Sequence, residues 1–305
     1  MSDWVAVSQR PVRSAARAVM VNCALAAISV GLGATGATPQ AVFKSQVDVV
    51  RVDVLALRHG APVGGLRPSD FELRDNGVRQ EIVSASIEEV PIEALLVLDT
   101  SKSITPDKAR ALREASSAFL DGLTARDRAG LLVFGGRPIL MQAPTSDGGR
   151  LGRLLQAVEG RGSTALNDAV FAALRLRQPG DARGAVLVFT DGVDNVSWLS
   201  PGEVIEAGRR SDAIVHAVVV GRAGIDNALL HEITRGSGGD VWPAAWGPKL
   251  ADAFRAVLDD LRSRYVLAYY PTDVATDGWH ALDVKVRLRS VSITHRSGYY
   301  RGERR

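Results

Sequence analysis

The chain has 305 residues, which is enough for one large domain with appendages or for two modest domains. Apolar residues make up 46% and charged residues 23%, a balance that allows a packed core and argues against gross disorder. The formal net charge is +3, and the arginines are scattered, which gives little support for nucleic-acid binding. The single cysteine, Cys23, excludes a disulfide framework within the chain and a cysteine zinc site.

The first 37 residues have the pattern of a secretory signal peptide. Three arginines, Arg10, Arg13 and Arg17, precede an alanine-rich apolar run at 18–33, and small residues follow at 34–37. The run is shorter than the roughly 18 to 20 residues that a membrane-spanning helix needs. There are two alternatives to a cleaved signal peptide. The segment could stay uncleaved as a membrane anchor, which is the one way we expect this protein to reach a membrane, or it could be a helix of the folded protein. We expect a secreted, periplasmic or cell-envelope protein that loses Cys23 on cleavage.

Residues 46–90 are predicted to form a small β region. Apolar and polar residues alternate from Gln46, with one slip near Val50 that we interpret as a β-bulge. Asp75-Asn76-Gly77 predicts a hairpin turn, because Asn and Gly tolerate positive φ. A further strand is predicted from Gln80 to Ile87.

Residues 91–262 alternate between apolar runs of strand length and segments with helical spacing. The predicted strands are 94–98, 130–134, 185–189 and 213–220, and the predicted helices are 106–123, 149–158, 165–176, 203–210, 227–235 and 249–264. This order predicts an α/β fold with a doubly wound, mainly parallel sheet covered on both faces.

Residues 263–305 return to β patterning, with alternation at 265–270 and 282–289 and a short strand at 291–294. Neither flanking β segment is large enough to bury a core alone. We therefore expect the segment at 263–305 to pack with the β region at 46–90, or to extend the main sheet.

Oxygen-bearing side chains gather at the predicted carboxyl edge of this sheet, where open α/β folds bind ligands. Asp99 ends the apolar run at 94–98, and Ser101 and Ser103 point to the same side if the following loop is extended. Thr164 precedes a helix, and Asp191 ends a buried strand. Two carboxylates and three hydroxyls are hard donors that suit Mg²⁺, Mn²⁺ or Ca²⁺. If an aspartate binds through water, a coordination position stays open for an external ligand.

This pattern resembles the metal-ion-dependent adhesion site of the von Willebrand factor type A family, which has Asp-x-Ser-x-Ser, then a Thr, then an Asp. The matching residues are Asp99, Ser101, Ser103, Thr164 and Asp191. The resemblance covers about residues 91–262. It implies a Mg²⁺ site and a binding role in which a carboxylate of a partner protein completes the coordination. The segments 70–77 and 265–271 are similar to those of a bacterial subgroup, the VWFA-related proteins of acidobacteria.

Other interpretations stay open. The Ser, Thr and Asp residues could simply cap helices. An aspartyl-phosphate phosphatase also places an Asp beside Mg²⁺, but Ser101 stands where a second acid is needed, so we do not expect an enzyme. A further alternative is an accessory subunit of a larger envelope or ATPase complex. The predicted signal peptide argues against a subunit of a cytosolic ATPase complex.

For several other residues we expect a structural role and no direct part in binding. Asp194 and Asn195 are interpreted as solvated turn residues and Lys102 as a solvent-facing side chain. His216 is expected to be a satisfied core residue, and Trp242 and Trp246 to pack locally.

Overall fold

The computed structural model describes residues 49–87 and 89–302. The predicted signal peptide and Cys23 lie outside these residues. Among the described helices, none is long and apolar enough to cross a lipid bilayer.

In the described part of the chain, six strands form the central sheet, which is parallel except at one edge. In spatial order they are β11 (Val241–Ala244), β10 (Ile214–Val220), β9 (Arg183–Thr190), β6 (Ile92–Asp99), β7 (Arg128–Phe134) and β8 (Pro138–Thr145). Strands β6, β9 and β10 are almost entirely buried, which explains why their sequences are continuous apolar runs rather than alternating ones. The sheet confirms the predicted α/β class.

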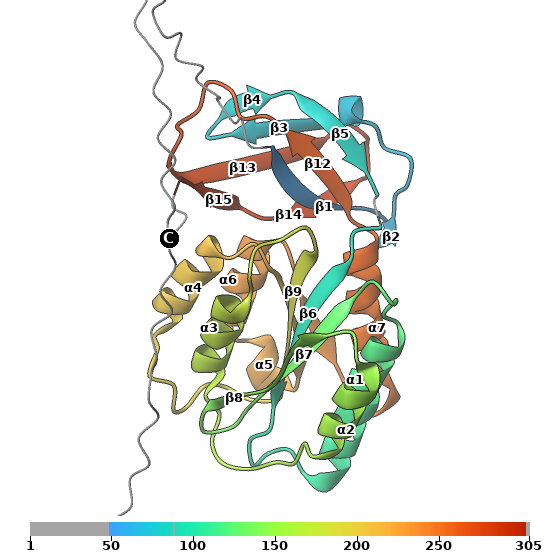
Figure 1. Cartoon of the computed structure of the whole chain (residues 1–305), viewed down its shortest axis with the longest axis vertical. Coiled ribbons are helices and arrows are strands. Elements are labelled where there is room, and N and C mark those ends of the chain that lie inside the picture. Colours follow the sequence, from blue (N-terminus) through green and yellow to red (C-terminus); the bar gives the residue numbers. More distant parts are fainter. Residues whose placement is uncertain (1–48, 88, 303–305) are drawn as a thin grey trace, which may run out of the picture. The chain divides into compact units, whose positions relative to one another are not determined.

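Helices cover both faces of this sheet (Figure 1). One face packs against α1 (Pro106–Asp121), α2 (Gly148–Gln156) and α7 (Pro248–Arg262). The other face packs against α3 (Leu166–Leu176), α4 (Pro201–Arg210) and α6 (Ala228–Ser237). Each helix buries one apolar stripe, as their helical spacing predicted. A short α5 (Arg222–Ile225) follows β10.

Buried Asp127 ties the start of the sheet to the end of α7. Its carboxylate accepts hydrogen bonds from the backbone N–H groups of Ile92 (2.7 Å) and Thr124 (2.6 Å) and pairs with Arg262. Burial acts to raise the pKa of Asp127, but the hydrogen bonds, led by that of Arg262, outweigh it and lower the pKa to about 2. The ionised carboxylate therefore stabilises this junction at neutral pH.

The two flanking β segments pair with each other and form two further sheets around their own core. The first contains β14 (Ser292–His295), β1 (Val50–Arg58), β12 (Tyr265–Tyr269) and β5 (Ile82–Ser86), with β2 (Ala61–Pro62) at the end of β1. The second contains β15 (Gly298–Arg301), β13 (Gly278–Val286), β3 (Phe71–Asp75) and β4 (Val78–Gln80), and a 3₁₀ turn at Pro68–Asp70 precedes β3. The described parts of the segments 46–90 and 263–305 thus share one core, while the limits of these segments as separate domains stay a prediction.

Several local predictions were wrong. Strand β1 pairs with β12 in unbroken register from Val50, so there is no bulge there; the irregularity lies in the pairing of β12 with β5, where Val83 of β5 is the extra residue. The strand predicted from Gln80 to Ile87 is present as β5 at Ile82–Ser86, whereas Gln80 belongs to the end of β4. The hairpin at Asn76-Gly77 is confirmed, with positive φ at both residues. Edge strand β8 was missed because its half-exposed residues show no apolar alternation.

Candidate metal centre

Strand β6 carries Asp99 to the carboxyl edge of the sheet. The strand lies between β7 and β9, and its apolar residues fix it in the core. The Asp99 side chain is fully buried. Its Oδ1 accepts a hydrogen bond from the Ser101 N–H (2.8 Å), and its Oδ2 accepts one from the Thr190 hydroxyl at the end of β9 (2.7 Å). Two neighbouring strands therefore hold the orientation of this carboxylate.

Ser101 and Ser103 follow in a turn. The Ile104 N–H donates to the Ser101 carbonyl at 3.0 Å, so the loop is a turn and not an extended segment. The prediction that an extended loop would point both serine side chains to the same side was therefore wrong. They converge nevertheless: their hydroxyl oxygens lie 3.0 Å apart, and the Ser103 hydroxyl donates to Asp191 Oδ1 at 2.6 Å. The turn brings Ser103 to Asp191 and places the Ser101 hydroxyl beside that of Ser103.

Thr164 is fixed to the loop that follows Asp191. The side-chain Oδ1 of Asn195 accepts from the Thr164 N–H at 2.9 Å, and the Asn195 N–H donates back to the Thr164 carbonyl at 3.0 Å. A Cβ placed on Gly192 would lie 4.0 Å from the Thr164 hydroxyl oxygen, which places that hydroxyl beside the Asp191 loop. Within the described residues the hydroxyl has no hydrogen-bond partner, so it is free to bind a ligand.

The interpretation of Asp194 and Asn195 as solvated turn residues was wrong. Asn195 holds Thr164, and the Asp194 carboxylate accepts hydrogen bonds from the N–H of Asn167 and from Ser197. Both side chains satisfy backbone donors that would otherwise be left unpaired near the start of α3. Lys102 is exposed, as predicted. His216 is buried, as predicted, and its Nδ1 accepts from the Trp242 indole N–H, but its buried Nε2 makes no hydrogen bond within the described residues and lies 3.3 Å from Asp260 Oδ1.

Gly160 lets two site loops approach at backbone distance. A Cβ at this position would lie 2.0 Å from the Ile104 carbonyl oxygen, a contact that no larger residue can make. The loops are joined by hydrogen bonds from the Arg161 N–H to the Thr100 carbonyl (2.5 Å) and from the Lys102 N–H to the Gly162 carbonyl (3.0 Å). The serine turn is therefore held from both sides. Sequence reasoning missed Gly160, since a single glycine in a loop carries no specific signal.

Lys108, in the first turn of α1, is the other residue that sequence reasoning missed. Its ammonium lies 2.9 Å from Asp191 Oδ2 and 3.0 Å from the Ser103 carbonyl oxygen, and 5.0 Å from the ring centroid of Trp246. A cation near a helix N-terminus is disfavoured by the helix dipole. That unfavourable position was the available signal that a carboxylate lies close by.

The helix-capping interpretation does not describe these hydroxyls. The N-cap of α1 is Thr105 and that of α3 is Ala165, and neither cap makes a side-chain hydrogen bond. Ser101, Ser103 and Thr164 are therefore directed to the cluster and not to the helix ends.

The charge balance of the cluster suits a divalent cation. Burial raises the pKa of Asp99, hydrogen bonds from Thr190 and Ser101 offset part of that shift, and the nearby charge of Asp191 adds to it. No lysine or arginine pairs with Asp99 in the described part of the chain. A cation bound here would supply the missing positive charge. Two carboxylates and three hydroxyls fit Mg²⁺, Mn²⁺ or Ca²⁺ in donor type. Within the described ranges, no group of three or more His, Cys, Asp or Glu forms another metal cluster.

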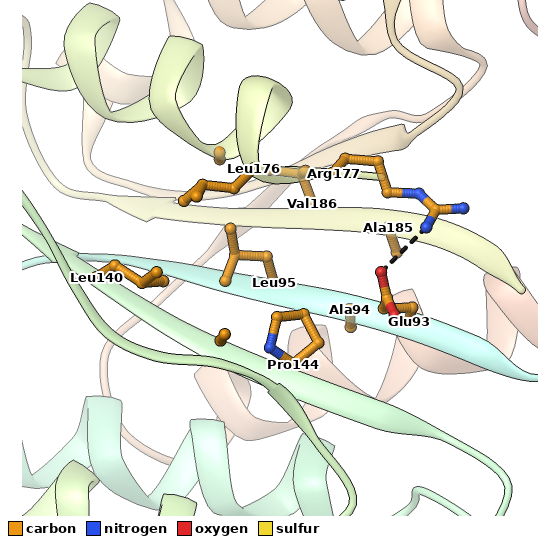
Figure 2. A pocket seen from close by; sticks show the side chains of 11 residues that line it. Glu93, Ala94, Leu95, Leu140, Pro144, Leu176, Arg177, Ala185 and Val186 are labelled. Carbon is orange, nitrogen blue, oxygen red and sulfur yellow. Dashed lines mark hydrogen bonds and ion pairs between the residues drawn. The ribbon is translucent and has the colours of Figure 1, made fainter. Parts of the chain in front are cut away.

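A cavity elsewhere in the sheet does not belong to this cluster. It is lined by Glu93, Leu95 and Arg177 among others, and Figure 2 shows the Glu93–Arg177 ion pair at its rim. Glu93 lies six residues before Asp99 on β6, which puts the cavity about 20 Å from the cluster. Its volume of about 50 Å³ holds a few water molecules and no larger ligand.

Residues 94–193 match the family model of the von Willebrand factor type A domain, and all five candidate ligands lie within this range. The chain contains a von Willebrand factor type A domain. The domain's central sheet carries the cluster at its carboxyl edge, as the resemblance implied. That the five residues bind a metal stays a proposal, as does membership of the bacterial subgroup.

Two comparisons with individual proteins agree with the domain. Human inter-alpha-trypsin inhibitor heavy chain H4 is 27% identical over 128 residues, which are 38% of this chain and only 14% of the human protein. Proximal thread matrix protein 1 of the mussel byssus is 18% identical, with a TM-score of 0.50 over 60% of this chain and 48% of that one. A second structure of the mussel protein, also with a TM-score of 0.50, has zinc in its metal-ion-dependent adhesion site (MIDAS) motif. At these identities the structural likeness shows the fold alone.

Proposed function

We propose that this domain binds one divalent cation through Asp99, Ser101, Ser103, Thr164 and Asp191, and uses the cation to bind a carboxylate of a partner protein. The observation that carries the proposal is the cluster of Asp99, Ser101, Ser103 and Asp191 oxygens, with the Thr164 hydroxyl beside the Asp191 loop. Among the described residues, the buried Asp99 carboxylate at its centre has no basic partner. Two carboxylates only balance a divalent charge, so a bound cation remains an acceptor for a further anion. Mg²⁺ is the cation that the family resemblance favours.

The binding role is favoured over hydrolysis by the residue types present. A phosphatase of the aspartyl-phosphate type needs a second carboxylate as acid or base, and Ser101 occupies that place. The nearest basic group, Lys108, is already engaged by Asp191. The pattern of residues 1–37 supports export, and we propose that the domain works in the cell envelope or outside the cell.

Thermal unfolding tests cation binding without knowledge of the partner. A cation at one hundred times its Kd stabilises the folded state by about 2.7 kcal/mol, which corresponds to a rise in Tm of about 5 to 10 °C for a chain of this size. We expect this rise with Mg²⁺ or Mn²⁺, with Ca²⁺ and Zn²⁺ measured alongside.

The Asp99→Asn variant, which keeps the shape of the side chain, should lose the rise. Asp107→Asn, an exposed aspartate of α1, is the matched control and should keep it. An unchanged Tm of the wild type in every cation would refute the cation site.

The partner is tested by capture from an envelope fraction on immobilised protein, with Mg²⁺ or with EDTA. Capture that EDTA abolishes, and that Asp99→Asn also abolishes, supports a cation-dependent interaction. Capture that EDTA leaves unchanged contradicts the proposed role of the cation.

A further inference from the structure

The loop between β9 and α4 exposes large apolar side chains next to the candidate site. Trp198 is 96% exposed, Val193 51% and Val196 41%. Isolated exposed apolar residues are ordinary on a protein surface, but a tryptophan without any packing partner is not. These three residues are here called the apolar loop surface.

The backbone of this loop is fixed. The Asp168 carboxylate accepts hydrogen bonds from the N–H groups of Trp198 (3.1 Å) and Leu199 (3.0 Å). Asp194 binds the N–H and the hydroxyl of Ser197. A fixed backbone loses less conformational entropy when a partner binds, so the apolar loop surface is preorganised for binding.

The same loop is joined to two of the proposed cation ligands. It begins at Asp191, and its Asn195 forms the reciprocal pair with Thr164. The apolar loop surface and the cation would therefore belong to one rigid unit. A ligand that reaches both gains the second contact at a low additional entropic cost.

Two basic side chains border the candidate site, whereas the loop's nearby carboxylates, Asp168 and Asp194, are engaged by backbone N–H groups. Lys102 and Arg137 are exposed, and neither has a carboxylate partner within the described residues. Both lie beside Gly162: the Lys102 N–H bonds to its carbonyl, and a Cβ on Gly162 would lie 3.3 Å from the backbone nitrogen of residue 136, which precedes Arg137. With a bound cation, these charges favour a negatively charged segment.

We propose that the apolar loop surface docks a protein segment in which a large apolar side chain stands close to the carboxylate that binds the cation. The inference rests on the proposed function for the carboxylate and adds to it the apolar contact, with Trp198 as the main anchor. Tryptophan is among the residues that dominate binding energy at protein interfaces.

Selection from a random peptide display library on the immobilised protein tests this. Peptides bound in Mg²⁺ and released by EDTA should contain Asp or Glu next to an aliphatic or aromatic residue. The Trp198→Ser variant should bind the selected peptides about tenfold or more weakly. Val83→Ser, which replaces another exposed apolar side chain (51% exposed), is the matched control and should bind as the wild type does.

Three outcomes would overturn the inference: no peptide enriched in a Mg²⁺-dependent way, peptides selected for acidity alone, or equal binding to Trp198→Ser. A dimer in sedimentation that Trp198→Ser dissociates would also overturn it, because the surface would then be covered by a second copy.

Cation titration separates this inference from the proposed function. Trp198→Ser should bind Mn²⁺ as tightly as the wild type, because Trp198 is not a ligand. If the wild type binds no cation, the proposed function fails, whichever peptides are selected. If it binds Mn²⁺ and the peptides ignore Trp198, only the apolar contact fails.

Discussion

The ion pair between Lys108 and Asp191 leads to a prediction about cation affinity. The ammonium contacts Asp191 Oδ2 at 2.9 Å, so it competes with a metal ion for one of only two carboxylates in the cluster. The Asp191 side chain is 6% exposed and that of Lys108 31%, which places the pair at the strong end of exposed ion pairs, about 1 kcal/mol. Lys108→Met removes the charge and keeps an apolar stem against Trp246. We expect the variant to bind Mg²⁺ or Mn²⁺ about fivefold more tightly.

Isothermal titration of the wild type and Lys108→Met with Mn²⁺ measures this difference directly. Without cation, the variant should be less stable than the wild type by about 1 kcal/mol, because Asp191 loses its partner. Lys102→Met, which removes an exposed lysine of the same turn, is the control and should change the affinity less than twofold. An affinity of Lys108→Met equal to or below that of the wild type would refute the competition, and would mean that Lys108 positions Asp191 instead.

Three further predictions concern stability. Asp127→Asn should cost about 2 kcal/mol at neutral pH, and the cost should shrink as pH falls from about 4 to 2 in urea unfolding, since the lowered pKa stabilises only the ionised form; a cost independent of pH would contradict this. Gly160→Ala should destabilise by about 1 to 3 kcal/mol and weaken Mn²⁺ binding, whereas Gly152→Ala, with open space around it, should do neither. Thr190→Val should cost about 1 to 3 kcal/mol in the same assay, and Thr190→Ser, which keeps the hydrogen bond to Asp99, should cost clearly less.

The central fold could be predicted from the sequence because its strands and helices have different apolar periods. Buried parallel strands such as β6 and β9 appear as continuous apolar runs, and the helices show one apolar stripe each. The edge strands β8 and β11 could not be predicted, because their half-exposed side chains show neither an apolar run nor a regular alternation of apolar and polar residues.

The candidate ligands were predictable, but the groups that hold them were not. Asp99 ends the buried strand β6 and Asp191 directly follows the buried strand β9, so strand prediction places them at one sheet edge. Asn195 and Gly160 act through tertiary contacts across loops, for which residue type and spacing give no rule. The position of Lys108 near a helix N-terminus indicated a nearby carboxylate but not which one. Asp75 is a similar case: it begins a predicted turn, yet its buried carboxylate accepts from two tyrosine hydroxyls and contacts His280 Nδ1.

Binding of Mn²⁺, followed by the relaxation of water protons, tests the central claim most directly, because it reports both the bound ion and water at an open coordination position. We predict one Mn²⁺ per chain with enhanced water relaxation in the wild type, and no binding by Asp99→Asn at the same concentrations. Binding that persists unchanged in Asp99→Asn, or a wild type that binds no Mn²⁺, would contradict the account.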